Sequence, residues 1–384
     1  MRLGPPAFDF EQAPFLVIWE VTRACALACV HCRADALPRR DPRELTSDEG
    51  FCLIDQVRAF GPRPPLFVLT GGDPMRRPDL AALVRYAADG GLTIALTPSG
   101  TAAATRARLT DLKDAGLSRV AVSLDGPTPE THDAFRRVHG SYAWTMRIID
   151  DAIALGLPLQ INSTVSKQTL PQLDVLAVRI AELPVTLWAL FFLIQTGRGI
   201  GLEPITAEEC ERVLHFLYDL SLTARFGIKT TEAPHYHRVV WQREREQAAL
   251  GQPTHACERR RQPGVPSARF VRDGVVFRAP RSVNDGNGFV FIDHLGNICP
   301  SGFLPVPRGN IRADSLVRIY RQDELFLRLR NPNALLGKCG RCQFRAICGG
   351  SRSRAFAATG AVMASDPLCV YEPGSTLEPL ATPA

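Results

Sequence analysis

The chain has 384 residues and 45% hydrophobic content, enough for one large barrel plus a smaller appendage. Its net charge of +6 comes with only short basic runs, so nucleic-acid binding is not indicated. The longest apolar run, residues 187–194, is far shorter than the ~20 residues that cross a bilayer, so no membrane contact is expected. The amino-terminal stretch MRLGPPAFDFEQ lacks the apolar core of a secretory signal. We therefore expect a cytoplasmic protein whose eleven cysteines serve metal binding and not disulfides.

Apolar or β-branched runs alternate with helix-like patterns from residue 15 to about 225, the order typical of βα units around a parallel sheet. Six strands are predicted, at residues 15–22, 66–71, 93–98, 119–125, 159–165 and 186–194. Intervening segments such as 79–89 and 105–115 carry helical periodicity. The sequence thus predicts an α/β barrel of βα repeats, in which motifs that follow strands meet at the carboxyl ends.

The composition divides the chain into five segments. Residues 1–14 are an N-terminal extension and residues 15–225 the barrel. Residues 226–290, where Gly, Pro and charged residues interrupt the pattern, are predicted to connect the domains and border the cavity. Residues 291–372 are rich in cysteine and are expected to depend on metal for folding, and residues 373–384 form a flexible tail.

Three cysteines follow the first predicted strand: Cys25, Cys29 and Cys32, in the spacing Cys-x3-Cys-x2-Cys. An iron–sulfur cubane normally takes four cysteines, so a compact loop of three leaves one iron for a small molecule, with S-adenosylmethionine (SAM) as the candidate. A zinc knuckle is the alternative, but it prefers two cysteine pairs with a fourth ligand close by.

This spacing resembles the signature of the radical SAM enzymes. The resemblance implies a partial (β/α)6 TIM-type barrel, in which a [4Fe-4S] cluster held by Cys25, Cys29 and Cys32 passes one electron to SAM. The resulting 5′-deoxyadenosyl radical then takes a hydrogen from the substrate. His31 would lie near the adenine, and a flavodoxin- or ferredoxin-type protein would supply the electron.

Residues after the second predicted strand resemble the family's contact with the methionyl amino group of SAM. They are Gly71, Gly72 and Asp73, where the glycines let the backbone approach a ligand. The family usually has Glu at the position of Asp73. A glycine pair after a strand can also be an ordinary turn.

Residues at the fourth and fifth strands resemble further SAM contacts. Ser123 and Arg136 correspond to residues that hold the methionyl carboxylate, a task that suits the planar guanidinium. Asn162 and Thr164 correspond to ribose contacts, and Val165 could line the adenine. A surface position for Arg136 and helix capping by Asn162 and Thr164 are the alternatives. After the sixth strand, Arg198 lies between two glycines and could face substrate or cofactor.

The carboxyl-terminal region contains a second cysteine group, Cys339, Cys342, Cys348 and Cys369, which resembles the auxiliary-cluster domain known as SPASM, or its shortened twitch form. Four thiolates would close a second [4Fe-4S] cluster and leave it an electron-transfer or structural role. Zinc is the alternative because Cys-x2-Cys also makes zinc knuckles. Cys299 could be a remnant of a further site, a substrate ligand or a buried residue.

The segments around residues 191–199 and 348–369 resemble enzymes of the alternative haem synthase and haem d1 subgroup, which implies a tetrapyrrole substrate. In the connecting region, Tyr236 could transfer a proton or hydrogen atom, and His235 or His237 could ligate haem iron; an ordinary solvated loop is the alternative. A peptide-modifying maturase and a non-catalytic two-cluster electron carrier are the competing functions.

Overall fold

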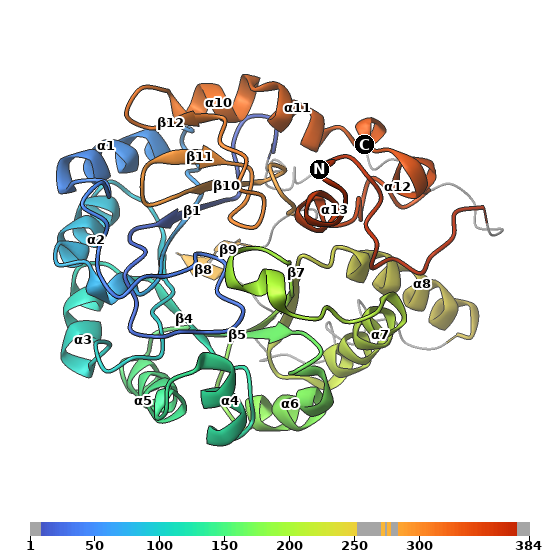
Figure 1. Ribbon diagram of the computed structural model, residues 1–384, viewed down its shortest axis with the longest axis horizontal. Helices are drawn as coiled ribbons and strands as arrows, with labels where there is room; N and C mark the ends of the chain where they lie inside the picture. Colours follow the sequence, from blue (N-terminus) through green and yellow to red (C-terminus); the bar gives the residue numbers. More distant parts are fainter. Residues whose placement is uncertain (1–8, 252–269, 273–274, 278–282, 375–384) are drawn as a thin grey trace.

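The computed structural model describes residues 9–251, 270–272, 275–277 and 283–374. Most of the predicted N-terminal extension, part of the predicted connecting region and most of the predicted tail lie outside these residues. Figure 1 shows a curved sheet with helices around its outer face. Among the described helices, none has both the length and the apolar character that a bilayer crossing requires.

Seven consecutive parallel strands form the barrel wall: β1 Leu16–Glu20, β2 Leu66–Thr70, β3 Ile94–Leu96, β4 Arg119–Ser123, β5 Leu159–Val165, β6 Leu187–Phe192 and β7 Gly227–Thr231. The first six confirm the predicted strands and the partial-barrel fold. β7 falls where only a connecting segment was expected. Its sequence, GIKTT, carries a glycine and a lysine, which weaken the strand signal, but it gains a full register of pairing with β6.

The carboxyl-terminal strands continue the same sheet beyond β1. Strand β10 (Phe289–Ile292) pairs in parallel with β1, while β11 (Asn297–Cys299) and β12 (Gly309–Asn310) follow in antiparallel order. The sheet is therefore mixed, and its order is β12-β11-β10-β1-β2-β3-β4-β5-β6-β7. A separate antiparallel pair joins β8 (Phe270–Arg272) to β9 (Val275–Phe277).

Helices follow the strands as the periodicity predicts. The barrel helices are α1 Ser47–Arg58, α2 Leu80–Asp89, α3 Arg106–Asp114, α4 Pro129–Arg136, α5 Ser141–Ala154, α6 Leu173–Ala181, α7 Ala207–Thr223 and α8 His235–Ala249. The later ones are α10 Leu316–Gln322, α11 Glu324–Arg330, α12 Gly337–Arg341 and α13 Arg352–Thr359. Helices α1 and α7 each start with a capping box, Thr46 with Glu49 and Thr206 with Glu209, which satisfies backbone N–H groups at their first turns.

The two faces of the sheet differ in chemistry because side chains alternate along each strand. Trp19, Val122 and Trp188 are fully buried in the core between strands and helices. The alternate positions point to the concave side and include polar residues such as Ser123 and Asn162, which are neighbours in the β4–β5 register. A polar concave face at the carboxyl ends of parallel strands is the position where barrel enzymes place their ligands.

Candidate active site

The three-cysteine loop leaves the end of β1 and is fixed by backbone hydrogen bonds to the next strand connection. The Gly72 N–H donates to the Thr22 carbonyl and the Asp73 N–H to the Ala24 carbonyl, both at 2.7 Å. A side chain at Gly72 would place its Cβ 2.5 Å from the carbonyl oxygen of Arg23. The glycine is therefore required for the close approach of two chain segments at the base of the cysteine loop.

The sulfur atoms of the loop lie among hydrogen-bond donors. The Leu27 N–H donates to Cys25 Sγ at 3.3 Å, the Ala36 N–H to Cys32 Sγ at 3.4 Å, and Arg136 Nη1 lies 3.7 Å from Cys29 Sγ. Burial raises the pKa of Cys25 to about 11 and also raises that of Cys29. These thiols therefore require a bound cation to ionise near neutral pH, and donors to sulfur then stabilise the thiolates.

Arg136 is held by a buried carboxylate that the sequence reasoning did not select. Its guanidinium pairs with Asp125, whose other oxygen accepts the Thr164 N–H at 2.6 Å. Although burial opposes its ionisation, the charge of Arg136 keeps the pKa of Asp125 below its usual range. Arg136 Nε is buried and has no hydrogen-bond partner among the described residues. A SAM carboxylate at this position would share the guanidinium with Asp125, so the predicted role of Arg136 stays a prediction.

Asp73 organises the loop beneath the cysteines. It is fully buried, Thr101 Oγ1 donates to it at 2.7 Å, and the Met75 N–H donates at 3.2 Å. The neighbouring Ser99 hydroxyl donates to the Gly72 carbonyl at 2.5 Å and lies 3.6 Å from Cys25 Sγ. Ser99 was not among the predicted site residues. Its position after β3, at the carboxyl end of a barrel strand, was the available hint.

The remaining predicted SAM contacts divide between the two faces of the sheet. Ser123 and Asn162 are adjacent in register on the concave side, and the Gln160 side chain donates to Asn162 Oδ1 at 2.6 Å. His31 stacks on Phe135 with 4.3 Å between ring centroids. Val165 is fully buried in the helix-facing core, so its placement gives no support to the predicted contact with adenine.

Arg198, which follows the barrel strand β6, binds the backbone of the cysteine loop. Its Nε donates to the Cys29 carbonyl at 2.9 Å, its Nη1 to the Ala36 carbonyl at 3.0 Å, and its N–H to the Cys32 carbonyl at 3.0 Å. Gly197 has a φ of 53°, and a Cβ there would lie 2.4 Å from the Arg33 carbonyl oxygen. Arg198 thus holds the backbone of the loop, and its predicted contact with substrate or cofactor stays a prediction.

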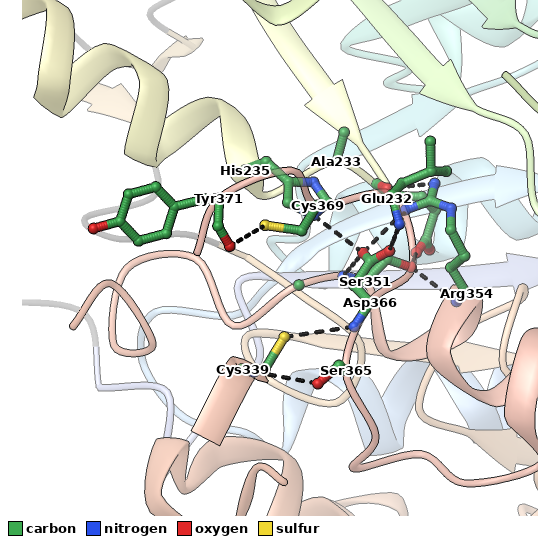
Figure 2. Close-up of polar contacts among 12 residues, drawn as sticks. Glu232, Ala233, His235, Cys339, Ser351, Arg354, Ser365, Asp366, Cys369 and Tyr371 are labelled. Atoms are coloured by element: carbon green, nitrogen blue, oxygen red, sulfur yellow. Dashed lines mark hydrogen bonds and ion pairs between the residues drawn. The ribbon is translucent and has the colours of Figure 1, made fainter. Parts of the chain in front are cut away.

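The four carboxyl-terminal cysteines line a single pocket, together with His235 and Arg238 of α8. The Asp366 N–H lies 3.5 Å from Cys339 Sγ (Figure 2). Lys338 donates to the Cys369 carbonyl at 2.7 Å. Four sulfurs and nearby N–H donors are a donor set that fits an iron–sulfur cluster. Among the described residues, no group of three or more His, Cys, Asp or Glu side chains is arranged to hold a single metal ion.

The structure separates the residues predicted for substrate chemistry. The Tyr236 hydroxyl donates to the Leu217 carbonyl of α7 at 3.4 Å, and the ring packs against the core. His235 is buried and His237 is exposed on the same helix. Cys299 is buried in β11 opposite Phe291, where burial raises its pKa to about 12. None of these contacts joins Tyr236 to the three-cysteine loop, and its catalytic role stays a prediction.

Known proteins resemble this chain over most of its length. Residues 19–173 match the family described as the Radical SAM superfamily. The AdoMet-dependent heme synthase of Oleidesulfovibrio alaskensis is 39% identical over 95% of this chain and 89% of its own. The chain belongs to the radical SAM superfamily. This radical SAM enzyme is also 36% identical to the AdoMet-dependent heme synthase of Methanosarcina barkeri, over 94% of this chain and 98% of that protein.

The fold of this radical SAM enzyme recurs in solved structures. Streptococcus suis SuiB bound to S-adenosylmethionine superposes with a TM-score of 0.67 at 15% identity, covering 94% of this chain and 78% of the other. Because the superposition covers 94% of this chain, the shared fold includes the carboxyl-terminal region as well as the barrel. The superfamily uses a [4Fe-4S] cluster and SAM.

Proposed function

We propose that this radical SAM enzyme modifies a tetrapyrrole, oxidatively decarboxylating propionate side chains as an AdoMet-dependent haem synthase. The observation that carries this proposal is the 39% and 36% identity to two proteins of that name, which extends over nearly the whole chain and includes both cysteine regions. A relationship limited to the barrel would support only the shared radical chemistry. Identity of 36% and 39% that also covers the carboxyl-terminal region supports a shared substrate class.

The concave side of the sheet supports a substrate that is flat, apolar and carboxylated. Phe191 and Phe303 pack with 6.4 Å between ring centroids, and the Arg33 guanidinium lies 4.6 Å from the ring centroid of Phe291. Lys229 of β7 is exposed and lies opposite Ala189 in the strand register. Since Trp188 and Leu190, on either side of Ala189, face the helices, Ala189 and Lys229 face the concave side. Arg33 is already paired with Glu20, which leaves Lys229 of these two cations for a propionate. Aromatic side chains with an exposed lysine suit a macrocycle whose propionates need charge partners.

The proposal assigns each cysteine group its own cofactor. Cys25, Cys29 and Cys32 would hold the [4Fe-4S] cluster that binds SAM, and Cys339, Cys342, Cys348 and Cys369 a second one. When bound, the first cluster and SAM supply the radical that removes hydrogen from the substrate, and the second serves electron transfer or structure. Arg198 and Arg136 fix the first loop, and the first electron would come from a flavodoxin- or ferredoxin-type protein.

The test is an anaerobic assay with reductant and SAM, in which iron-coproporphyrin and candidate peptides are offered separately and product masses are followed. We expect the porphyrin to lose a formate-equivalent mass per reacting propionate, with deoxyadenosine formed in parallel. A mass change in a peptide with the porphyrin unchanged would favour the maturase. If no condition produced deoxyadenosine, the electron-carrier alternative would replace the enzyme.

A further inference from the structure

The first turn of α8 forms part of the wall of the auxiliary cysteine pocket. His235 and Arg238 are three residues apart, so both side chains project from the same face of the helix. Both line the pocket that contains Cys339, Cys348 and Cys369, and Figure 2 shows His235 next to Cys369. Since α8 directly follows the barrel strand β7, the barrel contributes side chains to the surroundings of the auxiliary site.

His235 is buried without a hydrogen bond that would explain its burial. The residue is 1% exposed, and neither ring nitrogen has a hydrogen-bond partner among the described residues. A neutral imidazole carries one N–H in either tautomer. A buried N–H without an acceptor destabilises the folded chain, so an acceptor for it must be identified.

The nearest carboxylate is already engaged by other donors. His235 Nε2 lies 3.4 Å from Asp366 Oδ2, but that oxygen accepts the Ser351 N–H at 2.7 Å and Arg354 Nη1 at 3.1 Å. Asp366 Oδ1 accepts the Leu368 N–H at 3.0 Å. Asp366 is therefore a poor acceptor for an additional N–H. Among the side chains that line the pocket with His235, the four cysteines supply sulfur acceptors, whereas Arg238, Lys338 and Arg345 are donors.

Arg238 has a different role in the same wall. Its guanidinium is bound by Glu211 of α7 and by Gln242, at 2.8 and 2.7 Å from Nη1, and it lies 5.3 Å from the ring centroid of Tyr371. These contacts engage the charge of Arg238, although its Nε is buried without a hydrogen-bond partner among the described residues. Of the two side chains, His235 is the one whose polar atoms all lack such a partner.

We propose that His235 donates an N–H···S hydrogen bond to the auxiliary iron–sulfur cluster and thereby raises its reduction potential. The inference rests on the proposed second cluster. Hydrogen bonds to the sulfurs of a cluster stabilise its more negative, reduced state, so the loss of one such bond lowers the potential. The barrel would in this way set the electron affinity of the auxiliary site through a single side chain of α8.

The experiment isolates the auxiliary site in the full chain by replacing Cys25, Cys29 and Cys32 with Ala. In this background His235→Leu removes the donor, His235→Gln keeps an N–H donor, and His237→Leu is the matched control on the exposed side of the same helix. Each protein is reconstituted anaerobically, its iron is counted, and its cluster is titrated potentiometrically with detection by electron paramagnetic resonance.

We expect His235→Leu to shift the one-electron equilibrium about tenfold toward the oxidised cluster, equivalent to roughly 59 mV, with His235→Gln closer to the parent and His237→Leu unchanged. Equal potentials in His235→Leu and His237→Leu would overturn the inference while leaving the cluster in place. Loss of iron from both His235 variants would overturn it too, because it would point to ligation or assembly. Absence of any cluster in the parent background would refute the proposed second cluster itself.

Discussion

The two cysteine regions are built in opposite ways. The loop of Cys25, Cys29 and Cys32 is held mostly through its backbone, by Gly72, Asp73 and Arg198, and presents three sulfurs beside the polar concave face. The carboxyl-terminal region encloses four sulfurs in one pocket whose wall includes a helix of the barrel. A fixed loop that leaves one coordination position open suits binding and reaction, whereas an enclosed set of four suits electron storage or structure. The variants below test this contrast.

Replacing Cys29 with Ala should have the largest effect. It removes one of three ligands from the loop, so deoxyadenosine formation should be abolished while the auxiliary cluster survives. Iron should fall from about eight to about four per chain after anaerobic reconstitution. Unchanged SAM cleavage in this variant would refute the assignment of the loop, and a zinc-filled auxiliary site would already limit the unmodified protein to about four irons.

Replacing Cys348 with Ala should remove the auxiliary cluster and leave the SAM-binding cluster in place. Iron should again fall to about four per chain, but reductive cleavage of SAM should persist because the first loop is intact. Product formation from the porphyrin should stop. Deoxyadenosine and porphyrin mass are measured in the same reaction, and full product formation without the second cluster would remove its proposed role.

Gly72→Ala tests whether the first loop depends on close backbone packing. A Cβ at this position would lie 2.5 Å from the Arg23 carbonyl oxygen and 2.6 Å from that of Ala24, so we expect loss of the SAM-binding cluster. Gly201→Ala is the matched control, because its Cβ would meet nothing within 4 Å. Iron content and deoxyadenosine yield distinguish the two, and equal behaviour would show that the loop tolerates displacement.

Asp125→Asn tests the buried ion pair beneath Cys29. The change leaves Arg136 buried without a full countercharge, and we expect a loss of about 3 kcal/mol in the free energy of unfolding, measured by urea denaturation. Glu182→Gln removes a surface pair with Arg179 and should change stability by less than about 0.5 kcal/mol. Similar losses in both variants would mean that Asp125 contributes no more than a surface carboxylate.

The smallest expected effect concerns a contact between the two halves of the chain. The hydrogen bonds from Arg312 lower the pKa of Glu49, at the start of α1, from 4.5 to about 2. Because folding lowers this pKa, the pair stabilises the protein above pH 4.5 and loses that contribution as the pH falls toward 2. The free energies of unfolding of the protein and of Glu49→Gln, from thermal denaturation, should therefore differ at pH 6 by less than about 1 kcal/mol and converge as the pH falls to about 2. A constant difference would contradict the assignment.

Local signals in the sequence predicted much of the barrel. The strands at Leu66–Thr70 and Leu159–Val165 begin where expected because an apolar run bounded by turns is a short-range pattern. Strand β7 was not predicted because its sequence GIKTT is a weak strand signal, and β10 was not placed in the barrel sheet because its partner β1 lies near the other end of the chain. Asp125 and Ser99 were missed because their roles depend on tertiary contacts. Asp125 pairs with Arg136 of the next helix, and Ser99 lies beside Cys25 of another loop.

The sequence by itself determined the family and the two cysteine groups, since ligand spacing is a local property of the chain and survives in its linear order. Only the tertiary structure decided that Arg198 holds the cysteine loop, that Val165 faces the helices and that His235 lines the auxiliary pocket. These roles depend on the direction of a side chain and on neighbours contributed by other elements. Packing of the whole chain fixes both, and no single segment contains that information.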